Sequence, residues 1–135
     1  MENRMPEANL QLTSILLIDN HLTFVNALIP KLNEWGYTVS SCDNAVEAIQ
    51  LVKDKQFKLV LCELYLPSLR ADRLFTLLFR NDPELSCCLL TSADYDDPLI
   101  KKTIKLKNVK GLLKKPLSFE KLDVFLKKTF DLFQT

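Results

Sequence analysis

A set of polar side chains stands where apolar runs of the sequence end. Carboxylates, a hydroxyl and an ammonium bind ions or anionic groups when they converge, and otherwise form a buried ion-pair cluster. They converge only if the apolar runs before them are neighbouring parallel strands. The residues are Asp19 and Asn20 after the run 14–18, Glu63 after 57–62, Thr91 at the end of 86–91, and Lys115 with Pro116 shortly after 109–113.

The apolar runs are typical of strands in a parallel sheet. Ser14–Ile18 and Phe57–Cys62 are almost continuously apolar, which suits strands buried on both faces. Tyr37–Cys42 alternates apolar and polar residues and predicts a strand nearer the edge. Ser86–Thr91 and Val109–Leu113 are two further candidate strands.

Helical periodicities fill the intervals between these runs. Strands that alternate with helices at this spacing predict one α/β domain with a parallel sheet of five strands, doubly wound so that helices cover both faces. Ligand and reaction groups in such a sheet gather at the carboxyl ends of the strands. The predicted helices are 25–35 (stopped by Gly36, with a kink or break at Pro30), 45–52 (capped by Asp43 or Asn44), 74–78 (ended before Asp82-Pro83), 99–106, and 122–133 (capped by Ser118).

Composition narrows the class of protein. A chain of 135 residues with 47% hydrophobic residues suits one domain with a real core. We expect residues 1–11 to form a flexible leader, because they are polar and lack the apolar stretch of a signal peptide. Residues 12–135 then form the domain, and no run is long enough for a membrane span. These features favour a cytoplasmic protein.

Several kinds of chemistry are disfavoured by what the sequence lacks. Cys42, Cys62, Cys87 and Cys88 lie in apolar stretches without a C-x-x-C pair, which predicts buried reduced thiols. With one His and two Gly, the chain has no phosphate-binding loop and no dinucleotide fingerprint. No His pairs in sequence with a candidate Ser or Thr nucleophile. His21 follows the first acidic site and is interpreted as a surface or capping residue.

Four motifs follow the predicted strands in order: Asp19-Asn20, Glu63-Leu-Tyr-Leu-Pro67, Thr91-Ser92-Ala93 and Lys115-Pro116. With these motifs, residues 12–134 resemble the receiver domains of two-component response regulators. The resemblance implies a three-layer, CheY-like (flavodoxin-like) (βα)5 fold and a role in phosphorelay signalling, without enzymatic activity. It implies that an acidic pair holds Mg²⁺ and that an Asp accepts a phosphoryl group. It also implies that a Thr and a Lys before Pro contact the phosphate.

The chain departs from this pattern at the reacting positions. By the resemblance, Asn20 replaces the second acid and Glu63 the phosphoacceptor, while Leu112 replaces the aromatic switch residue that works with Thr91. Glu63 is one methylene longer than Asp, which displaces its carboxylate by about 1.5 Å. We therefore expect impaired or absent Mg²⁺ binding, with Asp19 and Glu63 as vestiges of the metal site, and phosphorylation-independent signalling.

Alternatives remain open for the pocket. Glu63 is expected to pair with Lys115, either as a plain ion-pair cluster or in partial imitation of a phosphorylated Asp. A receiver that is still phosphorylated by Mg²⁺-dependent, unusual chemistry is one alternative, and a flavodoxin-like small-molecule module is another.

Charge is divided sharply along the chain. Residues 1–97 hold 8 Lys and Arg against 14 Asp and Glu, whereas residues 98–135 hold 10 Lys against 3 Asp and Glu. In receivers the fourth helix, fifth strand and fifth helix form the usual docking surface, and the resemblance implies that this surface is basic here. We expect it to bind a signalling protein, which would be a kinase, an output domain or another regulator, or to form a homodimer. Nucleic acid is disfavoured, since this region has no Arg and no interleaved aromatics. The expected docking lysines are Lys101, Lys102, Lys105, Lys110, Lys121 and Lys128.

Overall fold

A computed structural model describes residues 13–130 of the chain, so the predicted leader 1–11 lies outside the described residues. Strands and helices alternate along this part. The strands are β1 (Ser14–Ile18), β2 (Thr38–Cys42), β3 (Leu59–Glu63), β4 (Ser86–Thr91) and β5 (Val109–Lys114). The helices are α2 (Leu22–Glu34), α3 (Ala45–Asp54), α4 (Ala71–Asn81), α5 (Pro98–Thr103) and α6 (Phe119–Phe130).

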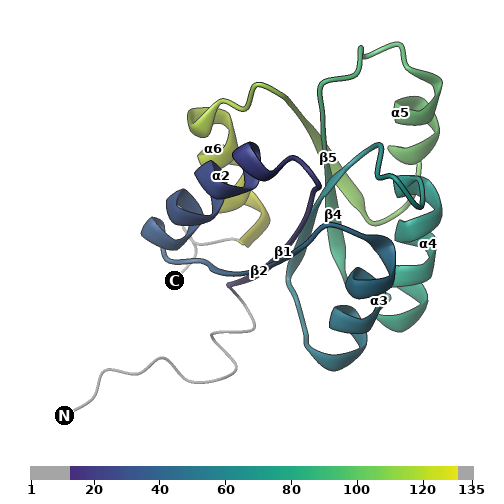
Figure 1. Cartoon of the computed structure of the whole chain (residues 1–135), viewed down its shortest axis with the longest axis horizontal. Coiled ribbons are helices and arrows are strands. Elements are labelled where there is room, and N and C mark those ends of the chain that lie inside the picture. Colours follow the sequence, from purple (N-terminus) through teal and green to yellow (C-terminus); the bar gives the residue numbers. More distant parts are fainter. Residues whose placement is uncertain (1–12, 131–135) are drawn as a thin grey trace.

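The strands form one parallel sheet in the order β2-β1-β3-β4-β5. Helices α2 and α6 cover one face, and α3, α4 and α5 cover the other (Figure 1). This is the predicted doubly wound α/β fold, with β2 at an edge as its alternating pattern indicated. From β1 the chain first adds β2 on one side, and then adds β3, β4 and β5 on the other side. The strand order therefore reverses between β1 and β3, and the carboxyl ends of these two strands border the crevice where such folds place their functional groups.

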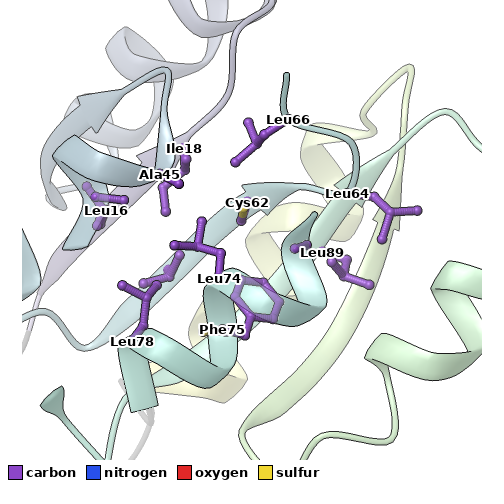
Figure 2. Packing of buried hydrophobic residues seen from close by; sticks show 14 of the residues in the cluster. Leu16, Ile18, Ala45, Cys62, Leu64, Leu66, Leu74, Phe75, Leu78 and Leu89 are labelled. Carbon is purple, nitrogen blue, oxygen red and sulfur yellow. The ribbon is translucent and has the colours of Figure 1, made fainter. Parts of the chain in front are cut away.

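Two apolar cores lie on opposite faces of the sheet because successive strand residues point to opposite sides. Leu16, Ile18 and Cys62 pack with the inner faces of α3 and α4, whereas Ile15 and Leu17 pack with α2 and α6. Figure 2 shows the first core, in which Phe75 of α4 lies beside the central strands. Since β1 and β3 are buried on both sides, the residues at their ends are held rigidly.

Helix α2 ends where the sequence predicted, but it does not break at Pro30. Gly36 has a φ of 97° and donates to the carbonyl of Asn33, while Tyr37 donates to that of Leu32. These two hydrogen bonds form a Schellman termination, which requires the left-handed conformation that glycine adopts readily. Pro30 lies on the exposed side of the helix, so the carbonyl that it leaves without an N–H donor can bond to water.

Other boundaries follow local capping. Asn44 accepts a hydrogen bond from the backbone of Glu47 and begins α3, and Ser118 accepts one from Lys121 at the start of α6. The helix predicted over 99–106 is shorter, because it ends at Thr103. β3 begins later than predicted, at Leu59, and includes Glu63 as its last residue. The part of the last helix predicted beyond Phe130 lies outside the described residues.

The four cysteines are buried and free, as predicted. Burial raises the pKa of each thiol, to about 12 for Cys42, where a hydrogen bond to the Asn44 carbonyl opposes the effect of burial. These thiols are therefore protonated core residues at neutral pH and make poor nucleophiles. None of the described helices is long and apolar enough to cross a bilayer.

Gly111 lets helix α6 approach strand β5 closely. A Cβ atom built on Gly111 would lie 2.8 Å from Cε1 of Phe125, which is closer than packed carbon atoms allow. We predict that Gly111→Ala lowers the free energy of unfolding by about 1–3 kcal/mol, as overpacking does, measured by urea denaturation. Adding Phe125→Leu should recover part of the loss, whereas Lys110→Ala at the exposed neighbouring position should change little. Equal effects of the two alanine substitutions would contradict the close approach.

Candidate functional site

The functional candidates from the sequence meet at the carboxyl edge of the sheet. Asp19 follows β1, Glu63 ends β3, and Lys115 follows β5. Asp19 and Glu63 are each 3% exposed, so both carboxylates are almost removed from water. Backbone hydrogen bonds fix the positions of Asp19 and Lys115: the N–H of Asp19 donates to the Cys42 carbonyl, and the N–H of Lys115 donates to the Thr91 carbonyl.

The ammonium of Lys115 bridges the two buried carboxylates. Its Nζ lies 2.7 Å from Oδ2 of Asp19 and 3.1 Å from Oε1 of Glu63. The side chain of Lys115 is only 11% exposed, and its Nζ also lies 4.2 Å from the centroid of the Phe24 ring. Attraction between these charges is strong because little water screens them, and the ring adds a cation–π contribution.

Both carboxylate oxygens of Glu63 are engaged. Oε2 accepts a hydrogen bond of 2.6 Å from the backbone N–H of Leu64, while Oε1 contacts Lys115. The extra methylene of Glu63 folds the carboxylate back over its own strand end, where it holds the backbone and the ammonium at once. The predicted pairing of Glu63 with Lys115 is therefore present.

His21 joins the same cluster through its ring. Its Nδ1 lies 3.1 Å from Oδ1 of Asp19, 3.1 Å from Nζ of Lys115 and 3.6 Å from Oε1 of Glu63. Depending on the tautomer, Nδ1 either donates to Asp19 or accepts from Lys115, and it cannot do both. His21 occupies the N-cap position of α2, but its side chain makes no capping bond. The imidazole, 57% exposed, is a solvent-facing cover on the ion pairs.

The other sequence candidates lie around this cluster without joining its ion pairs. Thr91 is buried, and its hydroxyl accepts a hydrogen bond of 3.1 Å from Ala93 N–H. Leu112 is half-buried on β5 and packs against the core beneath α3, α4 and α5. Pro116 is exposed and follows Lys115 through a cis peptide bond. Asn20 is exposed and lines a hollow of about 390 Å³ together with Asp19, Asp43 and Glu47.

Three side chains of the cluster also form a candidate metal-ligating set. One ligand atom from each of Asp19, His21 and Glu63 lies within 4.8 Å of the others. Two carboxylates and an imidazole would suit a transition metal better than Mg²⁺, which prefers oxygen ligands throughout. Any cation between the carboxylates would also have to displace the ammonium of Lys115.

A second contact ties the loop after β3 to the start of α5. The hydroxyl of Tyr65 donates to Asp97, lying 3.0 and 2.8 Å from its two carboxylate oxygens, and Oδ1 of Asp97 also accepts from Leu99 N–H as the cap of α5. The hydrogen bond from Tyr65 lowers the pKa of Asp97, and the same bond raises the pKa of Tyr65. A hydrogen bond thereby connects the loop that follows Glu63 to the first residues of α5.

The lysines predicted to dock partners are all exposed. They lie on three consecutive elements or the loop between them: Lys101 and Lys102 on α5, Lys105 just after it, Lys110 on β5, and Lys121 and Lys128 on α6. Of the six, Lys102 forms an ion pair, at 3.3 Å from Oδ2 of Asp72. Helix α5 lies on the opposite face of the sheet from α6, so these charges border β5 from both sides (Figure 1).

Sequence reasoning missed His21 as a cluster member, and it missed Phe24 and the Tyr65–Asp97 bond. A histidine two residues after a strand-end Asp is a usable signal, since a tight turn can fold its ring back over that Asp. Tyr65 and Asp97 are 32 positions apart. No local pattern indicates such a pair, because only the neighbouring positions of β3 and β4 bring their loops together.

Fold and site together define a class of protein: a doubly wound α/β domain with a pocket of two carboxylates and a lysine at its strand ends. A family model for the response regulator receiver domain matches residues 15–127, and the chain belongs to this family. Receiver domains act in two-component signalling, generally as non-enzymatic modules that interact with kinases and output domains.

Individual relatives agree with this assignment. The transcriptional regulatory protein ZraR of Klebsiella oxytoca is 27% identical over 112 residues, which cover 83% of this chain and 25% of ZraR, so the chain spans about a quarter of that relative. The signal receiver domain of an HD domain-containing protein from Pseudomonas fluorescens superposes with a TM-score of 0.82 at 25% identity, covering 96% of this chain and 93% of that one. A CheY-like receiver protein from Methanospirillum hungatei, 18% identical, has the same fold with a TM-score of 0.81, covering 88% and 94%.

The bridging role of Lys115 yields a stability prediction. Lys115→Met keeps most of the side-chain volume but leaves two buried carboxylates facing each other, so it should lower the free energy of unfolding by about 3 kcal/mol at pH 7. Lys127→Met, which removes a partly exposed i,i+4 ion pair with Asp123, should cost less than about 1 kcal/mol. Urea denaturation of both variants measures the difference. Adding Glu63→Gln to Lys115→Met should restore part of the lost stability, because it removes one of the two facing charges. Equal losses of stability in Lys115→Met and Lys127→Met would contradict the bridging role of Lys115.

The Tyr65–Asp97 bond predicts a pH-dependent contribution to stability. The pKa of Asp97 is lower in the folded protein than its ordinary value of 3.8, so the contribution is present above that value and is lost as pH falls through the folded pKa. Tyr65→Phe should move the Asp97 carboxyl titration, followed by ¹³C NMR, toward 3.8. The shift should be partial, because Leu99 N–H still donates to Asp97. An unchanged titration would show that the hydrogen bond from Tyr65 to Asp97 is not formed in solution.

Proposed function

We propose that this receiver domain signals by protein–protein contact without being phosphorylated. The carrying observation is the ammonium of Lys115 between Asp19 and Glu63, at 2.7 and 3.1 Å. In this arrangement the carboxylate at the acceptor position already satisfies the lysine that would otherwise contact a phosphoryl group. Glu63 thereby imitates part of what phosphorylation would supply, and the domain stays in one signalling state.

The chemistry of phosphoryl transfer also disfavours Glu63 as an acceptor. A nucleophilic carboxylate must present a free oxygen in line with the leaving group. The two oxygens of Glu63 instead face Leu64 N–H and Lys115 Nζ. Attack would require both contacts to be released inside a site from which water is nearly excluded.

The same residues do not fit Mg²⁺. The ion needs convergent oxygen ligands, and the uncharged Asn20 is exposed beside the pocket. The ammonium of Lys115 already compensates the charge of the carboxylates. The hollow beside the site is lined by Asp19, Asp43 and Glu47, so it would repel the phosphates of a nucleotide or flavin. These features favour a pocket that binds neither Mg²⁺ nor a phosphoryl group, and they disfavour a flavodoxin-like module that binds a small molecule.

Partner contact is proposed for the basic surface formed by α5, β5 and α6. Its exposed lysines suit an acidic patch on a signalling partner or an output domain, and opposite charges would speed association. ZraR is named as a transcriptional regulator, which is consistent with a receiver that works alongside an output module. Whether that module is covalently attached or separate does not affect the chemistry of the pocket.

A labelling experiment tests the proposal. The wild-type domain should show no acyl phosphate by intact mass spectrometry after incubation with acetyl phosphate or phosphoramidate and Mg²⁺. The double variant Asn20→Asp/Glu63→Asp restores a second acid and shortens the acceptor by about 1.5 Å, so we expect it to become labelled in a Mg²⁺-dependent way. Glu63→Gln serves as the matched control without a carboxylate. Labelling of the wild-type chain at Glu63 would overturn the proposal.

A further inference from the structure

A groove between α4 and α5 lies away from the strand-end pocket. It has a volume of about 490 Å³. The helices that line it, α4 and α5, lie on the same face of the sheet (Figure 1). Leu69, Leu77 and Leu106 line it and are half-buried, so they leave apolar surface open to solvent. This combination of a hollow and unfilled apolar surface is typical of a docking site.

The rim of the groove carries arginines, although the chain is otherwise rich in lysine. The sequence contains four arginines, and α4 with its first flanking residue holds three of them, at 70, 73 and 80. Arg73 and Arg80 are exposed beside the groove and form no ion pair within the described residues. Arginine pairs with carboxylates through two parallel hydrogen bonds and is enriched at the energetic centres of interfaces.

The acidic group in the groove is already neutralised. Asp72 is 6% exposed and lies 3.3 Å from both Arg70 and Lys102. Burial would raise the pKa of Asp72, but the hydrogen bond from Lys102 and the charge of Arg70 together lower it. The negative charge of Asp72 is therefore compensated by these two neighbours. Among residues 13–130, the guanidinium groups of Arg73 and Arg80 thus have no carboxylate partner, and the half-buried Leu77 lies between them on α4.

The spacing of these groups indicates the shape of the partner. Arg73, Leu77 and Arg80 stand at i, i+4 and i+7 on α4, so the guanidinium groups start about 10 Å apart along the helix axis with apolar surface between them. A second helix has the same rise, so acidic residues seven positions apart with leucines between them would match both arginines and the apolar floor.

We propose that the α4–α5 groove binds an acidic amphipathic helix of a partner protein. The charge complementarity of Arg73 and Arg80, together with the apolar floor, carries this assignment. The groove shares Lys102 of α5 with the basic surface of α5, β5 and α6, but the arginines proposed to contact the partner lie on α4.

The test uses the full chain and a synthetic probe. A fluorescein-labelled helical peptide with Glu at i and i+7 and Leu at i+3 and i+4 is titrated with the protein and followed by fluorescence anisotropy. Arg73→Glu/Arg80→Glu should raise the Kd by at least about tenfold, since it turns both attractions into repulsions. Lys121→Glu/Lys128→Glu, an equal charge change on α6, should alter the Kd by less than about threefold. Both pairs are exposed, and circular dichroism verifies folding.

Further controls separate the groove from general charge attraction. A scrambled peptide of the same composition should bind at least about tenfold more weakly than the amphipathic one, and ¹⁵N chemical-shift changes should centre on α4 and α5. Equal loss of affinity in the two double variants, equal binding of the scrambled peptide, or shifts centred on β5 and α6 would each overturn the proposal. A dimer seen by sedimentation that Arg73→Glu/Arg80→Glu dissolves would also overturn it, because the occupant would then be a second copy of the chain.

Discussion

One ammonium between two buried carboxylates is the constraint around which the functional end of this domain is organised. Lys115, Asp19 and Glu63 come from the ends of three strands, and each is almost removed from water. Charges in such a place are tolerated only when they compensate one another with good geometry. The cluster therefore joins β1, β3 and β5 at the edge of the sheet where receiver domains carry out their chemistry.

We propose that Glu63 stands where other receiver domains carry an acceptor Asp, and the length of its side chain changes how the lysine is held. The longer side chain of Glu63 brings one oxygen to the lysine and the other to the backbone of Leu64. The same contacts that neutralise the carboxylate also occupy it. Under the proposed function, an attack by this carboxylate would have to give up both contacts. His21 covers the cluster on the solvent side without closing it.

The remaining surface divides into regions with different chemistry. An acidic hollow lies beside β1, α2 and α3, a basic surface follows α5, β5 and α6, and a groove with arginines and leucines separates α4 from α5. The Tyr65–Asp97 bond connects the loop after Glu63 to the start of α5, which borders both the groove and the basic surface. Through this bond, the loop that follows Glu63 is linked to α5, and Lys102 of the same helix lines the groove.

The sequence by itself determined the fold class, because buried parallel strands require continuous apolar runs and their crossover helices require apolar stripes. It also determined which residue types stand at the strand ends, and so the pairing of Glu63 with Lys115 could be predicted. Two boundaries differ from the predictions: α2 continues through Pro30, because that residue faces solvent, and α5 ends at Thr103 and not at Leu106.

Only the tertiary structure decided the contacts between distant loops. The position of His21 over the cluster, the ring of Phe24 beside Lys115 and the bond from Tyr65 to Asp97 depend on strand order and on how each loop leaves the sheet. The groove between α4 and α5 likewise depends on how two helices pack on one face. Periodicity reports which side of an element is buried, whereas it carries no information about which side chains from separate elements arrive at the same point.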